Sequence, residues 1–171
     1  MIVTSMVLVG CKPPSLKSAN YFFDNQFYME LDGTPVVPAA RYDMPVEFVL
    51  TADSILLIKV VQSGEQNIEN KTHFRMLMEI KSYTGPGTYP VRHPNDSSSE
   101  PGAVIFYQEG SYSGNPVWYG QEGAENFIRI LELDSVHRHI SGIFRFILSD
   151  GIERKRVDNG FWDWNYIQIY Y

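Results

Sequence analysis

The segment HFRMLMEIKS, residues 73–82, alternates apolar and polar side chains. One face of the extended chain carries the apolar side chains Phe74, Met76, Met78 and Ile80. The opposite face carries Arg75, Glu79, Lys81 and, as an exception, Leu77. Because successive side chains of a strand point to opposite faces, this period of two predicts a half-buried β-strand.

The same period recurs along the chain between turn sequences. Further strands are expected at residues 27–31, 46–50, 54–62, 103–108, 127–133, 140–148 and 166–171. Turns are expected at residues 32–33, 85–89, 149–151 and 159–160, and loops at 92–102 and 109–125, the second long and mobile. No window has the spacing of a long amphipathic helix. We therefore expect an all-β fold, either an antiparallel β-sandwich or a flattened barrel, mainly a meander with little helix.

Composition and charge narrow the class of protein. The chain has 171 residues, 44% of them hydrophobic, which suits one β-domain over residues 21–171. Its formal net charge is -6, so we expect no nucleic-acid partner. No apolar run reaches the roughly 18 residues that a membrane-spanning helix requires.

The first residues are unusual because an apolar run, Ile2 to Val9, ends at the only cysteine, Cys11. A single cysteine excludes a disulfide within the chain and a metal site of several thiolates. The adjoining Lys12, Pro13 and Pro14 do not provide the rigid scaffold that a nucleophile and its base need, so we do not expect catalysis at Cys11.

Leu8-Val9-Gly10-Cys11 resembles the lipobox of bacterial lipoproteins. The resemblance implies that residues 1–10 are a signal segment and that Cys11 becomes the lipidated first residue of the mature chain. Residues 11–20 then form a tether to the β-domain. Because Lys12 is not an acidic retention residue, the resemblance implies an outer-membrane location, on the periplasmic face or at the cell surface. The alternative is that residues 2–9 form a first buried strand and Cys11 is a buried thiol.

Three longer passages carry a second resemblance: FYMELDGTPV (27–36), IKSYTGPGTYPV (80–91) and IRILELDSVHRHISGIFRFILSDGIERKRVDNGFWD (128–163). Together they resemble a family of small lipoproteins of unknown function that is common in Bacteroidota. The shared elements include a Gly-x-Gly-Thr-Tyr turn and a paired-strand signature at Gly142, Phe144, Phe146, Val157, Gly160 and Phe161. The chain departs from the family at Ile143, where Thr is more common, and in the aromatic tail after Asp163. The resemblance implies a secreted, lipid-anchored β-domain and supplies no catalytic residue.

Polar residues that could carry chemistry form no established motif. His137 and His139 would share one face of a strand, but two ligands do not make a metal site, and we expect none. A pair of carboxyls at glycosidase separation could come from Glu109, Glu122, Glu125, Glu132 and Asp134. Phosphate loops, nucleophile elbows and His-Glu-x-x-His motifs are missing from the sequence, so we expect no cofactor and assign no catalytic residue.

Aromatic residues are the better binding candidates. Tyr112, Trp118 and Tyr119 fall in the long polar loop, and Trp162 and Trp164 fall near the C-terminus. If exposed, such rings could stack on sugars or anchor a protein partner; alternatively, they fill the two ends of a small β core.

The sequence therefore favours a non-enzymatic, lipid-anchored protein of the cell envelope with a binding or structural role. Its expected partners are the membrane, through the lipid anchor, and a glycan or an envelope protein. One alternative is a small secreted glycan hydrolase, which predicts a cleft with two facing carboxyls. Another is a lipocalin-like carrier, which predicts a closed barrel around an apolar cavity.

Overall fold

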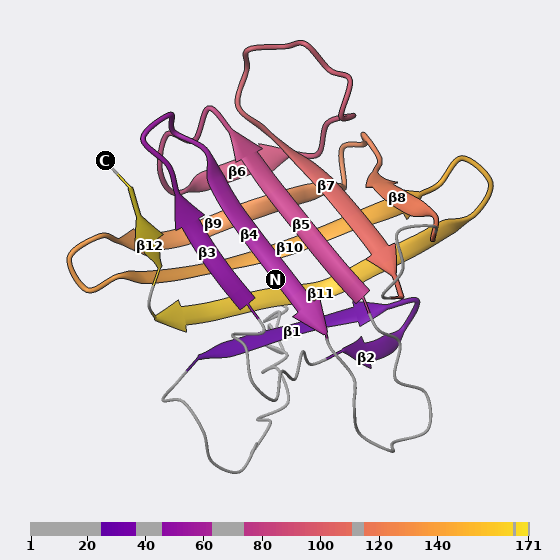
Figure 1. The fold of residues 1–171 in the computed structure, drawn as a ribbon, viewed down its shortest axis with the longest axis horizontal. Helices are drawn as coiled ribbons and strands as arrows, with labels where there is room; N and C mark the ends of the chain where they lie inside the picture. Colours follow the sequence, from indigo (N-terminus) through magenta and orange to yellow (C-terminus); the bar gives the residue numbers. More distant parts are fainter. Residues whose placement is uncertain (1–24, 37–45, 63–73, 111–114, 166, 171) are drawn as a thin grey trace, which may run out of the picture.

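The computed structural model describes residues 25–36, 46–62, 74–110, 115–165 and 167–170. Within these ranges the chain forms twelve strands and no helix, so the fold is all-β (Figure 1). No helix that could cross a membrane is found in this part of the chain. The strands pair in the order β12-β3-β4-β5-β7-β8-β10-β11-β1-β2. Outside this order, β9 also pairs with β10, and β6 pairs with β9.

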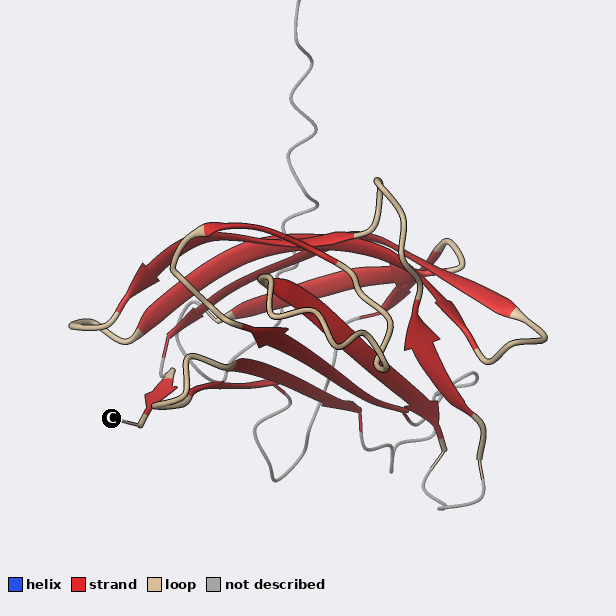
Figure 2. Ribbon diagram, turned by 90° about the horizontal axis from the view of Figure 1, so that it is seen from above, coloured by secondary structure: helices blue, strands red, loops and turns tan. Residues whose placement is uncertain are grey.

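The strands stack in two layers, which Figure 2 shows from above. The front layer, nearest the viewer in Figure 1, contains β3 (Val46–Leu50), β4 (Leu56–Gln62), β5 (Phe74–Lys81), β7 (Gly102–Glu109), β8 (Val117–Gly120) and β12 (Gln168–Ile169). The back layer contains β1 (Gln26–Leu31), β2 (Thr34–Val36), β6 (Gly87–Pro90), β9 (Phe127–Asp134), β10 (His139–Ser149) and β11 (Arg154–Asn165). The layers are joined where Tyr119 and Gly120 of β8 pair with Ser149 and Leu148 of β10. Within the described ranges the sheet does not close into a barrel, which is consistent with the predicted sandwich or flattened barrel.

Strand β5 has the alternation that its sequence predicts. Phe74, Met76, Met78 and Ile80 are buried between the layers, whereas Leu77 lies on the outer face of the front layer. There Leu77 pairs with Phe106 of β7, and Phe106 pairs with Tyr119 of β8. A row of apolar side chains across neighbouring strands therefore explains the exception in the alternation.

The core between the layers is rich in aromatic rings. Phe48 of the front layer lies 5.7 Å from Trp162 and 6.0 Å from Trp164 of the back layer, measured between ring centroids. Trp162 also stacks on Phe144 at 5.3 Å. The two contacts of Phe48 therefore link the front layer to the back layer.

The structure corrects four local predictions. Asn159-Gly160 is not a turn, because β11 continues through it with an extra residue opposite Arg145, and Asn159 adopts a positive φ of 51°. The segment 109–125 is not one long loop, because it contains β8. The segment 85–89 is a turn only in part, because β6 begins at Gly87. The last strand, expected to be antiparallel, is the two-residue β12, which pairs in parallel with β3.

Candidate functional site

The three predicted tryptophans do not form an exposed platform. Trp118, Trp162 and Trp164 are only 3%, 1% and 7% exposed, so the prediction that they stack on a ligand at the surface is wrong. The period-two alternation of β8 and β11 turns these rings inward, and there they pack in the core. The alternative interpretation, that tryptophan fills the core, is confirmed for them.

The remaining aromatic candidates have different outcomes. Tyr119 lies on the outer face of the front layer, half-buried, with its ring 5.6 Å from that of Phe106 in an edge-to-face arrangement. Tyr112 lies outside the described residues, as does Cys11. Tyr119 is therefore the one predicted aromatic side chain found at the surface of the described chain.

An open cavity of about 490 Å³ lies at one end of the sandwich, where β7 ends and β8 begins opposite the β10–β11 hairpin. This end of the molecule is at the right in Figure 1. From the front layer the cavity is lined by Glu109, Gly110, Asn115, Pro116 and Trp118. From the hairpin it is lined by Asp150, Ile152, Glu153 and Lys155. Its size is in the range of small-molecule sites, roughly 300 to 1,000 Å³.

Lys155 organises the inner wall of this cavity. Its Nζ lies 2.9 Å from Glu109 Oε1 and 4.7 Å from the centroid of the Trp118 ring. The side chain is only 19% exposed, because Lys155 shares the inward face of β11 with Val157. The ammonium is therefore held by a carboxylate and an aromatic face together, a combined ion pair and cation–π contact.

Glu109 of this wall also contacts a buried tyrosine, Tyr107. Tyr107 Oη donates to Glu109 Oε1 at 3.1 Å, and burial raises the pKa of Tyr107 above its ordinary value. Trp118 Nε1 is buried and has no hydrogen-bond partner within the described chain. Tyr107 and Lys155 thus both donate to Glu109, which fixes its carboxylate at the cavity.

Asp150 shapes the outer wall of the cavity by closing the β10–β11 turn. Its Oδ1 accepts hydrogen bonds from the backbone N–H groups of Ile152 at 2.9 Å and Glu153 at 2.8 Å. These two donors lower the pKa of Asp150, so it stays ionised at neutral pH. The turn presents Ile152 at its tip, 92% exposed, and the exposed Glu153 beside it.

Each of the five acidic residues considered for glycan hydrolysis contacts a partner in the structure. Glu109 pairs with Lys155, Glu125 with Arg145, and Asp134 with His137. Glu122 accepts a hydrogen bond from the backbone N–H of His93, and Glu132 lies 3.9 Å from His139 Nδ1. The carboxyl pKa values that the structure shifts, those of Asp96, Asp134 and Asp150, are all lowered, whereas a general acid needs a raised one.

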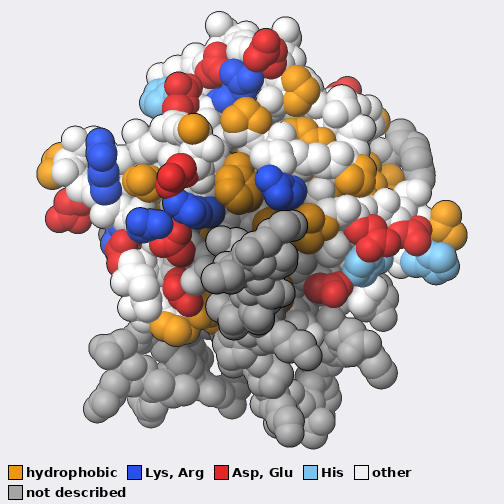
Figure 3. Space-filling model, turned by 180° about the vertical axis from the view of Figure 1, so that it is seen from behind, with side chains coloured by type: hydrophobic (Ala, Val, Ile, Leu, Met, Phe, Trp, Pro, Cys, Tyr) orange, Lys and Arg blue, Asp and Glu red, His pale blue; other side chains and the backbone are white. Residues whose placement is uncertain are grey.

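His137 and His139 contact different carboxylates. His137 Nδ1 lies 2.5 Å from Asp134 Oδ2, and His139 Nε2 lies 2.6 Å from Asp163 Oδ1. Figure 3 shows histidine side chains beside acidic ones at one edge of the back face. No group of three or more His, Cys, Asp or Glu in the described ranges is placed to hold a metal ion.

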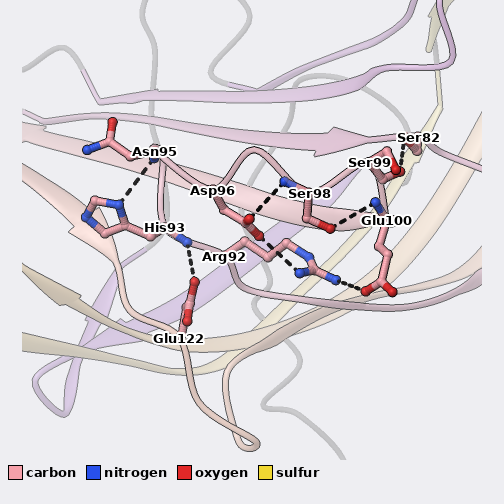
Figure 4. A network of polar contacts seen from close by, with 9 residues as sticks. All are labelled: Ser82, Arg92, His93, Asn95, Asp96, Ser98, Ser99, Glu100 and Glu122. Atoms are coloured by element: carbon pink, nitrogen blue, oxygen red, sulfur yellow. Dashed lines mark hydrogen bonds and ion pairs between the residues drawn. The ribbon is translucent and has the colours of Figure 1, made fainter.

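A second polar network closes the loop between β6 and β7 (Figure 4). Arg92 donates to Asp96 Oδ2 at 3.0 Å and to Glu100 Oε2 at 2.8 Å. The backbone N–H of Ser98 and the Arg92 guanidinium lower the pKa of Asp96. These contacts join residues of one loop to each other, so the network explains how the loop is held.

Comparison of the chain with protein-family models, with curated proteins and with solved structures finds no match. The resemblance to a family of Bacteroidota lipoproteins therefore stays a prediction.

The cavity was not predicted from the sequence, because its lining residues come from segments that are distant in the chain. One signal was available: Lys155 lies two residues before the apolar Val157, so a strand places both side chains on the same face.

Proposed function

We propose that the protein is a lipid-anchored protein of the cell envelope whose β-domain binds a small ligand in the cavity beside Trp118. The anchoring part of the proposal rests on the apolar run that ends in Leu8-Val9-Gly10-Cys11 and on the Pro13-Pro14 break after it. The expected location is the outer membrane, on its periplasmic face or at the cell surface.

The observation that carries the binding part is the open cavity of about 490 Å³ with an indole in its wall. Three of its four ionisable side chains have structural partners, because Lys155 and Glu109 pair with each other and Asp150 closes a turn; Glu153 is exposed at the rim. The two backbone N–H donors on Asp150 Oδ1 lower the pKa of this carboxyl, so it is ionised and does not serve as a general acid. This arrangement supports binding over glycan hydrolysis.

Replacement of Cys11 tests the anchor. In the native host, the wild-type protein is expected in the membrane fraction, with an intact mass that starts at Cys11 and includes acyl chains. Cys11→Ala removes the thiol that would carry the lipid, so the variant is expected to fold but to leave the membranes. Ser15→Ala, a change in the same tether, should leave the protein membrane-bound. An intact mass equal to unmodified residues 1–171 would contradict the proposal.

A fragment screen on the full chain tests the binding role. Cationic, neutral and anionic fragments are added in turn, and the indole N–H resonance of Trp118 is followed by NMR, with Trp118→Phe identifying the signal. At least one class is expected to shift this resonance, since Trp118 lines the cavity. If every class leaves it unchanged, the cavity is not a binding site.

A further inference from the structure

The charges around the cavity are unequal. Among the described residues that line the cavity, Glu109, Asp150 and Glu153 contribute three carboxylates and Lys155 contributes the one cation. Lys155 is already paired with Glu109, so Asp150 and Glu153 leave an excess of negative charge toward the open space. Added positive charge is therefore favoured in the cavity, and added negative charge is disfavoured.

The cavity wall already holds one ammonium, that of Lys155. The Lys155 ammonium lies 4.7 Å from the Trp118 ring centroid and 2.9 Å from Glu109 Oε1. An alkyl chain that ends in an ammonium thus already fits against this wall, with its charge on the indole face and its donors on a carboxylate. Ile152 at the rim adds an apolar side chain that can cover the alkyl part of a ligand.

We infer that the ligand of this cavity is a small molecule that carries a primary alkylammonium group. The ligand ammonium binds between Glu153 and Asp150, and its alkyl chain lies against Ile152 and the Trp118 wall. Lys155 already contacts Glu109 and the Trp118 ring, so it competes with the ligand as a like charge. The inference rests on the proposed binding function and adds the chemical class of the ligand.

Three matched probes test the ligand class on the full chain, purified in mild detergent. The probes are 1,5-diaminopentane, the neutral 1,5-pentanediol and the anion glutarate, and the readouts are calorimetry and the Trp118 indole resonance. The diamine is expected to bind, with an affinity that falls as salt is raised, because the attraction is electrostatic. The diol and glutarate are expected to leave the resonance unchanged.

Two variants test the assigned side chains. Glu153→Gln removes one carboxylate from the rim and is expected to weaken diamine binding by about threefold or more. Glu79→Gln makes the same charge change on the outer face of β5 and should have no effect. Lys155→Met removes the competing ammonium and frees Glu109, so diamine affinity is expected to rise by about tenfold.

The outcomes separate this inference from the proposed function. If the diol or glutarate binds as tightly as the diamine, the cavity is a binding site but the alkylammonium assignment is wrong. The assignment is also wrong if Lys155→Met weakens diamine binding while Glu153→Gln leaves it unchanged. If all three probes and the wider fragment screen leave Trp118 unaffected, the binding function itself fails.

Discussion

Gly142 and Gly160 each lie opposite a large ring in the β10–β11 pair. Gly142 pairs with Trp162, and Gly160 pairs with Phe144. A Cβ at Gly142 would lie 2.5 Å from Trp162 Cζ2, and a Cβ at Gly160 would lie 2.5 Å from Phe144 Cδ2. Both distances are far below van der Waals contact, so the two aromatic rings occupy the space that the glycines leave.

Gly142→Ala is therefore expected to destabilise the protein. The added methyl group meets Trp162 and the backbone oxygen of Arg129, so the free energy of unfolding should fall by about 1 to 3 kcal/mol. Urea unfolding followed by tryptophan fluorescence measures the change. Gly87→Ala is the control, because its nearest neighbour atom is 3.9 Å away and stability should hold or rise slightly. Equal losses in both variants would show that packing on Trp162 is not the cause.

The β9–β10 hairpin is an element whose turn is held by one aspartate. Asp134 Oδ1 accepts the backbone N–H groups of Val136 at 2.8 Å and His137 at 3.0 Å, and Oδ2 contacts the His137 ring. The His137 ring and these N–H groups lower the pKa of Asp134 to about 2. The Asp134 carboxylate raises the pKa of His137 above its ordinary value of 6.5.

The pKa shifts of Asp134 and His137 make the stability of the β9–β10 turn depend on pH. The contribution of His137 is fully present below pH 6.5 and is lost as the pH rises through its higher folded pKa. The contribution of Asp134 is present above its ordinary pKa of 3.8 and is lost as the pH falls toward about 2. The turn is thus held best between about pH 4 and pH 6.5.

An NMR titration of the histidine rings tests this element. His137 should titrate above pH 6.5 in the wild type and return to its ordinary value in Asp134→Asn, which lacks the carboxylate. Asp163→Asn, which removes the carboxylate at His139, should leave His137 unchanged. A His137 titration curve that is identical in wild type and Asp134→Asn would contradict the assignment.

At the scale of the whole molecule, Phe48 connects the two layers. It is 1% exposed, comes from β3 of the front layer, and its ring lies against Trp162 and Trp164 of the back layer. Phe106 of the same front layer points outward and is half-buried against Tyr119. The two phenylalanines therefore differ in whether they join the layers.

Phe48→Ala is expected to cost about 3 to 5 kcal/mol of unfolding free energy, because it leaves a cavity between the sheets. Phe106→Ala should cost clearly less, since its ring is half-buried on the outer face and no second layer of the described strands packs on it. Urea unfolding gives both values, and near-UV circular dichroism should report altered packing of the tryptophans in Phe48→Ala alone. If the two losses are the same, packing between the layers does not dominate stability.

Local pattern was enough to predict several elements of this protein. The alternation in residues 73–82, the Asp32-Gly33 turn and the 149–151 turn all depend on neighbours in the chain, and the structure has each of them. Asn159-Gly160 is also a local turn signal, because Asn and Gly adopt positive φ readily. A β-bulge uses positive φ as well, so only the pairing of β11 with β10 and β1 shows that this dipeptide forms a bulge and not a turn.

The sequence by itself determined the all-β class and most strand positions, because these depend on period and turn chemistry. The anchor at Cys11 rests on a short motif and stays a prediction. The tertiary structure alone decided that Trp118, Trp162 and Trp164 are buried and that Lys155 meets Glu109 across the layers. The physical reason is that alternation tells which residues share a face of one strand. It does not tell which face is covered by the other sheet, or which residues distant in the chain meet there.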